Sequence, residues 1–264
     1  MEICKALTEF YGSYDEDGRL SSRSGSVEFL TTMRYIEKYL QPGMRILEIG
    51  AATGRYSHAL ARKGYTVDAV ELVQHNIDIF VRNTQDGEKV TIRQGNAKDL
   101  HFVQDDTYHI TLLLGPMYHL FTVEEQRKAL SEAIRVTKRG GVVFAAYCGN
   151  DATMVQYIFG KGMIREKRYQ ELIDPVTFKA SSDPAELFEL YRREDIDALM
   201  DGFPVTRLHY VGTDMATHYM RGTVNAMEDE VFQKYLQYHF CICERGDMVG
   251  TSHHILDVFR KDAK

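Results

Sequence analysis

Several residue types are scarce in this sequence of 264 residues. It has no tryptophan, 5 prolines and 4 cysteines. Four scattered cysteines do not make the disulfide framework of a small secreted domain, and the C-x-C pair of Cys241 and Cys243 lacks the second pair of a zinc site. We therefore expect reduced thiols and no metal site.

Long apolar runs and an excess of positive charge are also absent. No apolar stretch reaches the length of about 18 residues that spans a bilayer, and no charged segment followed by an apolar one stands near residue 1. We therefore expect a cytoplasmic protein with no membrane partner. The formal net charge of −6 argues against a nucleic-acid partner, and we expect the basic stretch 161–168 to be solvated surface.

What the sequence does have is a regular alternation of strand and helix patterns from residue 44 to residue 148. The expected strands are 44–50, 66–72, 89–95, 108–115 and 141–148, and the expected helices are 54–64, 73–83 and 123–137. This alternation, mostly with short connections, is typical of an α/β fold in which a parallel sheet is covered by helices on both faces. Ligands bind such sheets at the carboxyl ends of the strands.

After residue 150 the alternation is less regular, although two more strands are expected at 204–214 and 253–261. We expect a single domain, 1–264, with an N-terminal helical arm at 1–40, a ligand-binding core at 41–150 and insertions at 151–192 and 213–250. The insertions are rich in aromatic residues and methionines, which favours a cap over a small, partly apolar ligand. Most of these side chains are expected to form the cap's own core.

The first strand runs into a glycine turn that has an acid before it, in the sequence EIGAATGR. A dinucleotide-binding G-x-G-x-x-G motif that starts at Gly50 would need glycine where the chain has Ala52 and Arg55. The turn instead follows the pattern acid-x-Gly-x-small-x-Gly, made by Glu48, Gly50, Ala52 and Gly54.

With this turn, residues 44–148 resemble the core of a class I S-adenosylmethionine-dependent methyltransferase. The resemblance implies a Rossmann-like, doubly wound sheet of seven strands, mainly parallel with the last strand antiparallel, plus helical cap elements. In that family the turn approaches the methionine end of S-adenosylmethionine, whose ammonium and sulfonium suit the carboxylate of Glu48. Ala52 replaces the usual second glycine, and its methyl group should tilt the cofactor slightly. The cofactor contacts implied at the turn are Glu48, Gly50, Ala51, Ala52, Gly54 and Tyr56.

Two later positions extend the resemblance. Glu71 ends the second strand about 20 residues after the turn, where the family has an acid that accepts hydrogen bonds from both ribose hydroxyls; the alternative is a solvated acid at a strand end. The run GNAKDL resembles the adenine-binding G-D-A-x-D/N-L motif, with Asn96 in place of the acid, and an amide can still accept from the adenine amine. The further implied cofactor contacts are Glu71, Leu72, Asn96, Ala97, Leu114 and Gly115.

After the fourth strand, the run GPMYHLF resembles the G-P-L-Y-H-L run of a branch of small-molecule methyltransferases. Pro116 stiffens this exit, so Met117, Tyr118 and His119 should project over the methyl group of the cofactor. His119 is the first candidate for a general base and Tyr118 the second; the alternative is that both only pack under the loop. Tyr11 and Tyr14 resemble an arm that closes over the cofactor, or else they dock as hydrophobic side chains.

These motifs predict an enzyme that moves a methyl group from S-adenosylmethionine to a nitrogen, oxygen or sulfur atom of a small molecule. A methyltransferase acting on RNA or protein is disfavoured by the acidic balance and by the lack of an N-P-P-Y-like motif after the fourth strand. A non-catalytic module that senses S-adenosylmethionine or S-adenosylhomocysteine would have no acceptor pocket. A nicotinamide-dependent oxidoreductase is disfavoured because Arg55 stands where the dinucleotide-binding motif needs a glycine. Nothing in the sequence predicts the oligomeric state.

Overall fold

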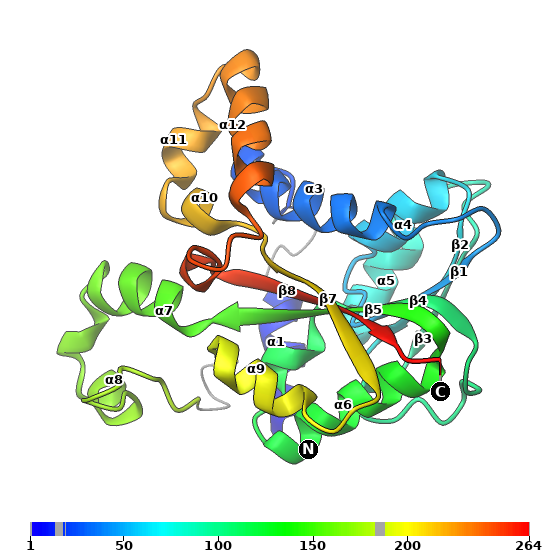
Figure 1. Cartoon of the computed structure of the whole chain (residues 1–264), viewed down its shortest axis with the longest axis horizontal. Coiled ribbons are helices and arrows are strands. Elements are labelled where there is room, and N and C mark those ends of the chain that lie inside the picture. Colours follow the sequence, from blue (N-terminus) through cyan, green and yellow to red (C-terminus); the bar gives the residue numbers. More distant parts are fainter. Residues whose placement is uncertain (1, 14–17, 19, 183–187, 264) are drawn as a thin grey trace.

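The structure is a computed structural model, and it describes residues 2–13, 18, 20–182 and 188–263. Figure 1 shows a central sheet with helices on both faces and a group of helices beyond one end of the strands. Tyr14, expected at the cofactor site, lies outside the described residues.

The sheet has eight strands, in the order β3-β2-β1-β4-β5-β8-β7, and the short β6 pairs with β5. β8 runs antiparallel to β5 and β7, whereas the other pairs are parallel. This confirms the mainly parallel sheet with an antiparallel last strand, to which β6 adds two residues. The strands are β1 (Arg45–Ile49), β2 (Thr66–Glu71), β3 (Val90–Gln94), β4 (Tyr108–Leu113), β5 (Thr137–Gly149), β6 (Leu190–Tyr191), β7 (Val205–Gly212) and β8 (His254–Lys261).

The described helices include the three that the sequence predicts in the core. They are α1 (Glu2–Ser13), α3 (Arg23–Glu37), α4 (Arg55–Arg62), α5 (Gln74–Asn83), α6 (Val123–Val136), α7 (Asn150–Thr153), α8 (Lys167–Leu172), α9 (Arg193–Met200), α10 (Met215–Tyr219), α11 (Arg221–Asn225) and α12 (Asp229–Ile242). Ser22 and Thr122 cap α3 and α6 by accepting a backbone N–H of the first turn. Within the described part of the chain, no helix combines the length and apolar character that a bilayer crossing needs.

Two apolar layers hold the helices to the sheet. Side chains alternate between the faces of a strand, so Ile46 and Phe144 pack in one layer with residues of α3 and α4. Leu47 and Val143 pack in the other layer with residues of α6 and α9. Figure 1 shows these two pairs of helices on opposite sides of the sheet.

The strand order reverses between β1 and β4, where the chain leaves one half of the sheet for the other. The crevice at the carboxyl ends of these two strands is the general ligand position in such folds. The cap stands beyond these ends and consists of α7 and α8 on one side and α10, α11 and α12 on the other (Figure 1). α3 joins this cap, because its Thr31 Oγ1 lies 2.9 Å from Nε2 of His239 on α12.

Candidate functional site

A cavity of about 140 Å³ lies at the carboxyl ends of β1, β2 and β4. Most residues that the sequence assigned to a cofactor line it. These are Glu48, Gly50, Ala51, Ala52, Tyr56, Glu71, Leu72, Asn96, Ala97, Leu114 and Gly115, together with Tyr118 and His119. Gly54 does not line this cavity.

Gly50 and Gly54 in the turn are glycine for different structural reasons. Gly50 has a φ of +74°, and a Cβ there would lie 2.6 Å from Cδ of Pro116, so only glycine lets the turn pack against the segment after β4. Gly54 has a φ of +91° and precedes α4, and a Cβ there would lie 2.5 Å from Cδ2 of Phe80. Gly54 therefore serves the packing of α4 against α5 and not the wall of the cavity.

Glu71 is held at the end of β2 by its neighbours. Its Oε2 accepts the backbone N–H of Ala52 at 2.9 Å, and its Oε1 accepts the backbone N–H of Val73 at 2.9 Å and a weaker bond from Asn76 at 3.4 Å. Burial raises the pKa of Glu71, and the two backbone hydrogen bonds oppose that rise. The alternative of a solvated acid is wrong, because the side chain is buried. Oε2 has the capacity to accept a second donor.

Glu48 is the second buried acid of this cavity. The hydroxyl of Ser57 donates to its Oε2. Burial raises the pKa of Glu48 to about 8, and the nearby charge of Glu71 adds to the rise. The carboxyl is therefore mostly protonated at neutral pH until a cation arrives and favours the ionised form.

Tyr11, Tyr118 and His119 stand where the small cavity meets a larger one. The hydroxyl of Tyr118 donates to the carbonyl of Leu114 at 3.1 Å, and its ring stacks on Phe188 with 5.8 Å between centroids. The Tyr11 hydroxyl lies 2.9 Å from Nε2 of His119. Tyr11 and Tyr118 line both cavities, whereas His119 lines only the smaller one.

Asn96 is partly engaged by the chain itself. Its side-chain oxygen accepts the backbone N–H of Lys98 at 3.0 Å, which closes a turn after β3. The amide oxygen that was expected to accept from the adenine amine therefore already has one donor, and its second lone pair is the one open to a ligand.

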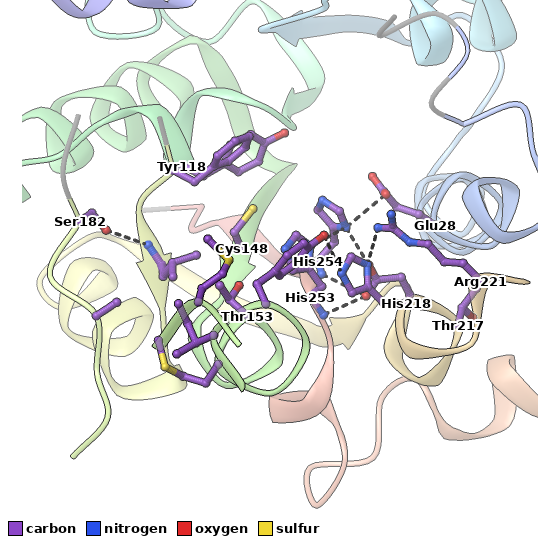
Figure 2. A pocket seen from close by; sticks show the side chains of 18 of the residues that line it. Glu28, Tyr118, Cys148, Thr153, Ser182, Thr217, His218, Arg221, His253 and His254 are labelled. Atoms are coloured by element: carbon purple, nitrogen blue, oxygen red, sulfur yellow. Dashed lines mark hydrogen bonds and ion pairs between the residues drawn. The ribbon is translucent and has the colours of Figure 1, made fainter. Parts of the chain in front are cut away.

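The larger cavity has a volume of about 620 Å³ and lies between the cap and the carboxyl end of β5 (Figure 2). One wall is apolar and includes Met154, Ile158, Met163, Leu172, Ile173, Phe188 and Leu190. The opposite end is polar and includes Glu28, Asp214, His218, Arg221, His253 and His254. An occupant of this cavity would meet both surfaces.

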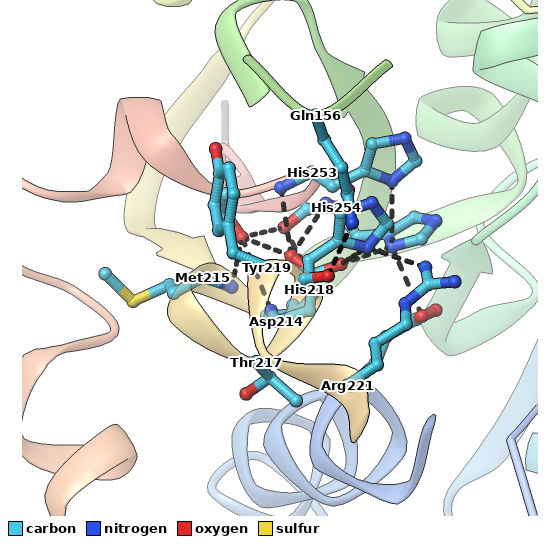
Figure 3. A network of polar contacts seen from close by, with 12 residues as sticks. Gln156, Asp214, Met215, Thr217, His218, Tyr219, Arg221, His253 and His254 are labelled. Carbon is cyan, nitrogen blue, oxygen red and sulfur yellow. Dashed lines mark hydrogen bonds and ion pairs between the residues drawn. The ribbon is translucent and has the colours of Figure 1, made fainter. Parts of the chain in front are cut away.

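Sequence reasoning did not identify this polar end, although Asp214, His218 and Arg221 lie in the insertion expected at 213–250. Asp214 Oδ2 lies 2.8 Å from Nδ1 of His254, and Asp214 Oδ1 accepts the backbone N–H groups of His253 and His254, each at 3.0 Å (Figure 3). Burial alone would lower the pKa of His254, but Glu28 and Asp214 raise it well above its usual value. Asp214 and His218 are four residues apart at the start of a helix, where such residues are neighbours. This spacing is the local pattern that could have indicated the polar end.

The comparisons with known proteins agree with this fold. Residues 46–141 match a family described as "Methyltransferase domain". Demethylmenaquinone methyltransferase from Clavibacter sepedonicus is 30% identical over 160 residues, and the aligned region covers 60% of this chain and 60% of that protein. The PH0226 protein from Pyrococcus horikoshii OT3 has a TM-score of 0.63 and 14% identity, and the match covers 96% of this chain and 99% of that one. Magnesium protoporphyrin IX methyltransferase from Synechocystis PCC 6803, solved with bound SAH, has a TM-score of 0.56 and 13% identity, with 90% and 83% of the two chains covered.

Residues 46–141 therefore match a methyltransferase domain, and S-adenosylmethionine is the cofactor of methyltransferases that share this fold. The family match ends at residue 141, before the cap begins. The chain spans only 60% of the length of the Clavibacter relative, so its own activity is argued from its own residues.

The small cavity fits this cofactor in its charge. Glu48 and Glu71 both line it, and in the described part of the chain neither forms an ion pair with a lysine, arginine or histidine. Glu48 can ionise to pair with the ammonium of S-adenosylmethionine but offers nothing to a pyrophosphate, and Glu71 can accept from the ribose. This charge pattern speaks against a nicotinamide dinucleotide more strongly than Arg55 does.

Proposed function

We propose that this protein is an enzyme that transfers the methyl group of S-adenosylmethionine to a nitrogen, oxygen or sulfur atom of a small molecule. The observation that carries the proposal is the pair of adjoining cavities, which share Tyr11 and Tyr118. A cofactor in the smaller cavity and an acceptor in the larger one would meet at these two side chains.

The cofactor supplies an electrophilic methyl group on a sulfonium, and the chain's own residues hold and orient it. Glu48 binds the methionine ammonium, Glu71 accepts from the ribose, and Asn96 with Ala97 contacts the adenine. Gly50 lets the turn pack against Pro116, and with Tyr118 both line the cavity that would hold the cofactor. Positioning and exclusion of water supply most of the rate acceleration in such an in-line displacement.

A base is needed only when the acceptor has to lose a proton. His119 does not line the larger cavity, but Tyr11 does, and the Tyr11 hydroxyl lies 2.9 Å from His119 Nε2. We therefore assign His119 as the proton acceptor and Tyr11 as the group through which the proton reaches it. Tyr118, whose hydroxyl is bonded to a backbone carbonyl, positions the acceptor ring or chain.

The acceptor class follows from the walls of the larger cavity. The apolar side would take a hydrocarbon or aromatic portion, and the polar end would take a group with hydrogen-bonding atoms. We infer an amphipathic small molecule as the acceptor. The cavity of about 620 Å³ also counts against a module that only senses the cofactor.

The test is a screen for turnover. The full chain is incubated with S-adenosylmethionine and pooled phenols, thiols, amines and N-heterocycles, and S-adenosylhomocysteine is measured by mass spectrometry. We expect release with at least one amphipathic class and much less with His119→Ala. Tight cofactor binding with no turnover in any pool would favour the sensing module instead.

A further inference from the structure

Among the described residues, Arg221 is the only lysine or arginine that lines the larger cavity. It begins α11 at the polar end, where its guanidinium donates to Nδ1 of His218 at 2.7 Å (Figure 2). Within the described part of the chain, Arg221 forms no ion pair with a carboxylate. The cavity therefore contains a permanent positive charge that no acid of the protein pairs with.

His218 accepts the hydrogen bond from Arg221 but brings no negative charge. Burial lowers the pKa of His218 and the charge of Arg221 adds to the lowering, while Asp214 opposes it. Asp214 Oδ2 is farther from His218 Nδ1 than Arg221 is, at 3.4 Å. The ring is therefore neutral at pH 7, with Nδ1 as a hydrogen-bond acceptor. The guanidinium keeps its full charge and has further N–H groups for a ligand.

The two acids at the polar end face a different cation. Asp214 Oδ2 lies 2.8 Å from Nδ1 of His254, and Glu28 Oε2 lies 3.3 Å from the same nitrogen. Both carboxylates raise the pKa of His254 well above its usual value, so this ring is an imidazolium. The acids therefore face the charge of His254, whereas Arg221 has no acid within ion-pair distance among the residues that the structure describes.

Asn225 adds a second donor beside Arg221. Residues four apart on a helix are neighbours on its surface, and Asn225 of α11 also lines the larger cavity. Its side-chain oxygen accepts the backbone N–H of Ser24 at 2.8 Å. Its amide nitrogen has no hydrogen-bond partner in the described part of the chain, so two N–H groups are open to a ligand. Ser24 is in the first turn of α3, whose dipole also favours negative charge here.

We propose that Arg221 and Asn225 bind a carboxylate of the methyl acceptor at the polar end of the larger cavity. A guanidinium presents two parallel N–H groups that match the two oxygens of a carboxylate, and the amide adds a further donor. The apolar wall takes the hydrocarbon part. Figure 2 shows Arg221 apart from Tyr118, where the two cavities meet, so the methylated atom is a different part of the acceptor. That this acid is the methyl acceptor rests on the proposed function, whereas the anion site does not.

The experiment uses octanoate as the probe and octanamide as its uncharged match. Binding of each to the full chain is measured by calorimetry. We expect a Kd for octanoate at least about tenfold lower than that for octanamide. Arg221→Gln should raise the Kd for octanoate at least about tenfold and leave that for octanamide nearly unchanged. Asn225→Asp keeps an oxygen for the N–H of Ser24 but adds a negative charge, so it should also weaken octanoate alone.

The matched control is Arg82→Gln, because Arg82 is exposed on α5, lines neither cavity and removes the same charge. Its Kd for octanoate should equal that of the unmodified chain. Circular dichroism and S-adenosylhomocysteine titration report on folding and on the cofactor site independently.

Three results would overturn the carboxylate site and leave the proposed methyl transfer standing. These are no binding of octanoate to the unmodified chain, equal Kd values for octanoate and octanamide, and unchanged octanoate binding in Arg221→Gln. Octanoate binding that depends on Arg221, together with no turnover in any acceptor pool, would support the carboxylate site and contradict the proposed function.

Discussion

At the scale of single residues, the proposed binding of S-adenosylmethionine depends on two buried acids of the smaller cavity. Glu48 and Glu71 differ in their partners, because Glu71 accepts three hydrogen bonds from nearby N–H groups and Glu48 accepts one from Ser57. Glu48 therefore shows the larger rise in pKa, to about 8. Glu48 should therefore make cofactor affinity depend on pH, whereas Glu71 should contribute through its charge.

Cofactor affinity should depend on pH through Glu48. Below its pKa of about 8 the carboxyl has to release a proton before it can pair with the ammonium, so affinity should rise by up to about tenfold per pH unit between about pH 6 and 7.5. The pKa of Glu48 is about 8 in the folded chain and 4.5 at its usual value. Between these two pH values the folded chain holds a proton that the unfolded chain has lost, so the contribution of Glu48 to the free energy of unfolding falls as the pH rises. Calorimetric titration at several pH values measures the affinity. Glu48→Gln should abolish this dependence, and an unmodified chain with pH-independent affinity would contradict the assignment.

Removing the charge of Glu71 should weaken binding of the cofactor. Glu71→Gln keeps the shape but loses charge-assisted hydrogen bonds to the ribose, at a cost of about 1.5 to 3 kcal/mol, or roughly 10- to 100-fold in Kd. Glu124→Gln, at an exposed position on α6, is the control and should leave the Kd for S-adenosylhomocysteine unchanged. Equal affinities in the two variants would remove Glu71 from the ribose site.

His119 should affect turnover and not cofactor binding. If it accepts the proton, His119→Ala lowers kcat by about 10²- to 10⁴-fold with a nearly constant Kd for the cofactor. Tyr11→Phe breaks the contact at 2.9 Å and should also lower kcat. His119→Gln separates the roles, because glutamine keeps bulk and hydrogen bonding but does not titrate. Full activity in that variant, with an unchanged acidic limb of the pH profile, would mean that His119 only shapes the cavity.

At the scale of elements, the turn between β1 and α4 joins the fold to the site. Gly50→Ala places a Cβ 2.6 Å from Pro116 in a left-handed backbone conformation and should lower the free energy of unfolding by about 2 to 3 kcal/mol. Gly64→Ala is the matched control, since Gly64 has a φ of +91° but no atom within 4 Å of its Cβ position, and it should cost about 1 kcal/mol. Urea denaturation compares them. Equal losses would show that the contact with Pro116 is unimportant.

The sequence predicted elements whose signals are local. The apolar runs of β1, β2 and β4 and the turn after β1 lie within short stretches, so their positions agree with expectation. β5 begins at Thr137 and not at residue 141, because Thr137 pairs with Tyr108 beyond an irregularity in the ladder. Gly54 was assigned to the cofactor from its motif, and the structure places it against Phe80 and His58.

The polar end of the larger cavity could not be predicted in this way. Glu28, Asp214 and His254 are far apart in the sequence, and they meet only because α3 and α10 pack beside the start of β8. Their proximity is a property of tertiary packing, for which no short pattern exists. The four-residue spacing of Asp214 and His218 is the one part of this group that a local sequence pattern could indicate.

At the scale of the whole molecule, the core and the cap have separate roles. The core carries the family match and the smaller cavity, and the cap lines a second cavity that shares Tyr11 and Tyr118 with it. S-adenosylmethionine or its product should therefore bind in the smaller cavity.

The most direct measurement is a calorimetric titration of the full chain with S-adenosylhomocysteine and, separately, with NAD⁺. Two buried acids in the smaller cavity predict a single site for S-adenosylhomocysteine, weakened in Glu71→Gln, and no measurable heat with NAD⁺. Binding of NAD⁺ at the same site, or no binding of S-adenosylhomocysteine or S-adenosylmethionine to the unmodified chain, would contradict the account.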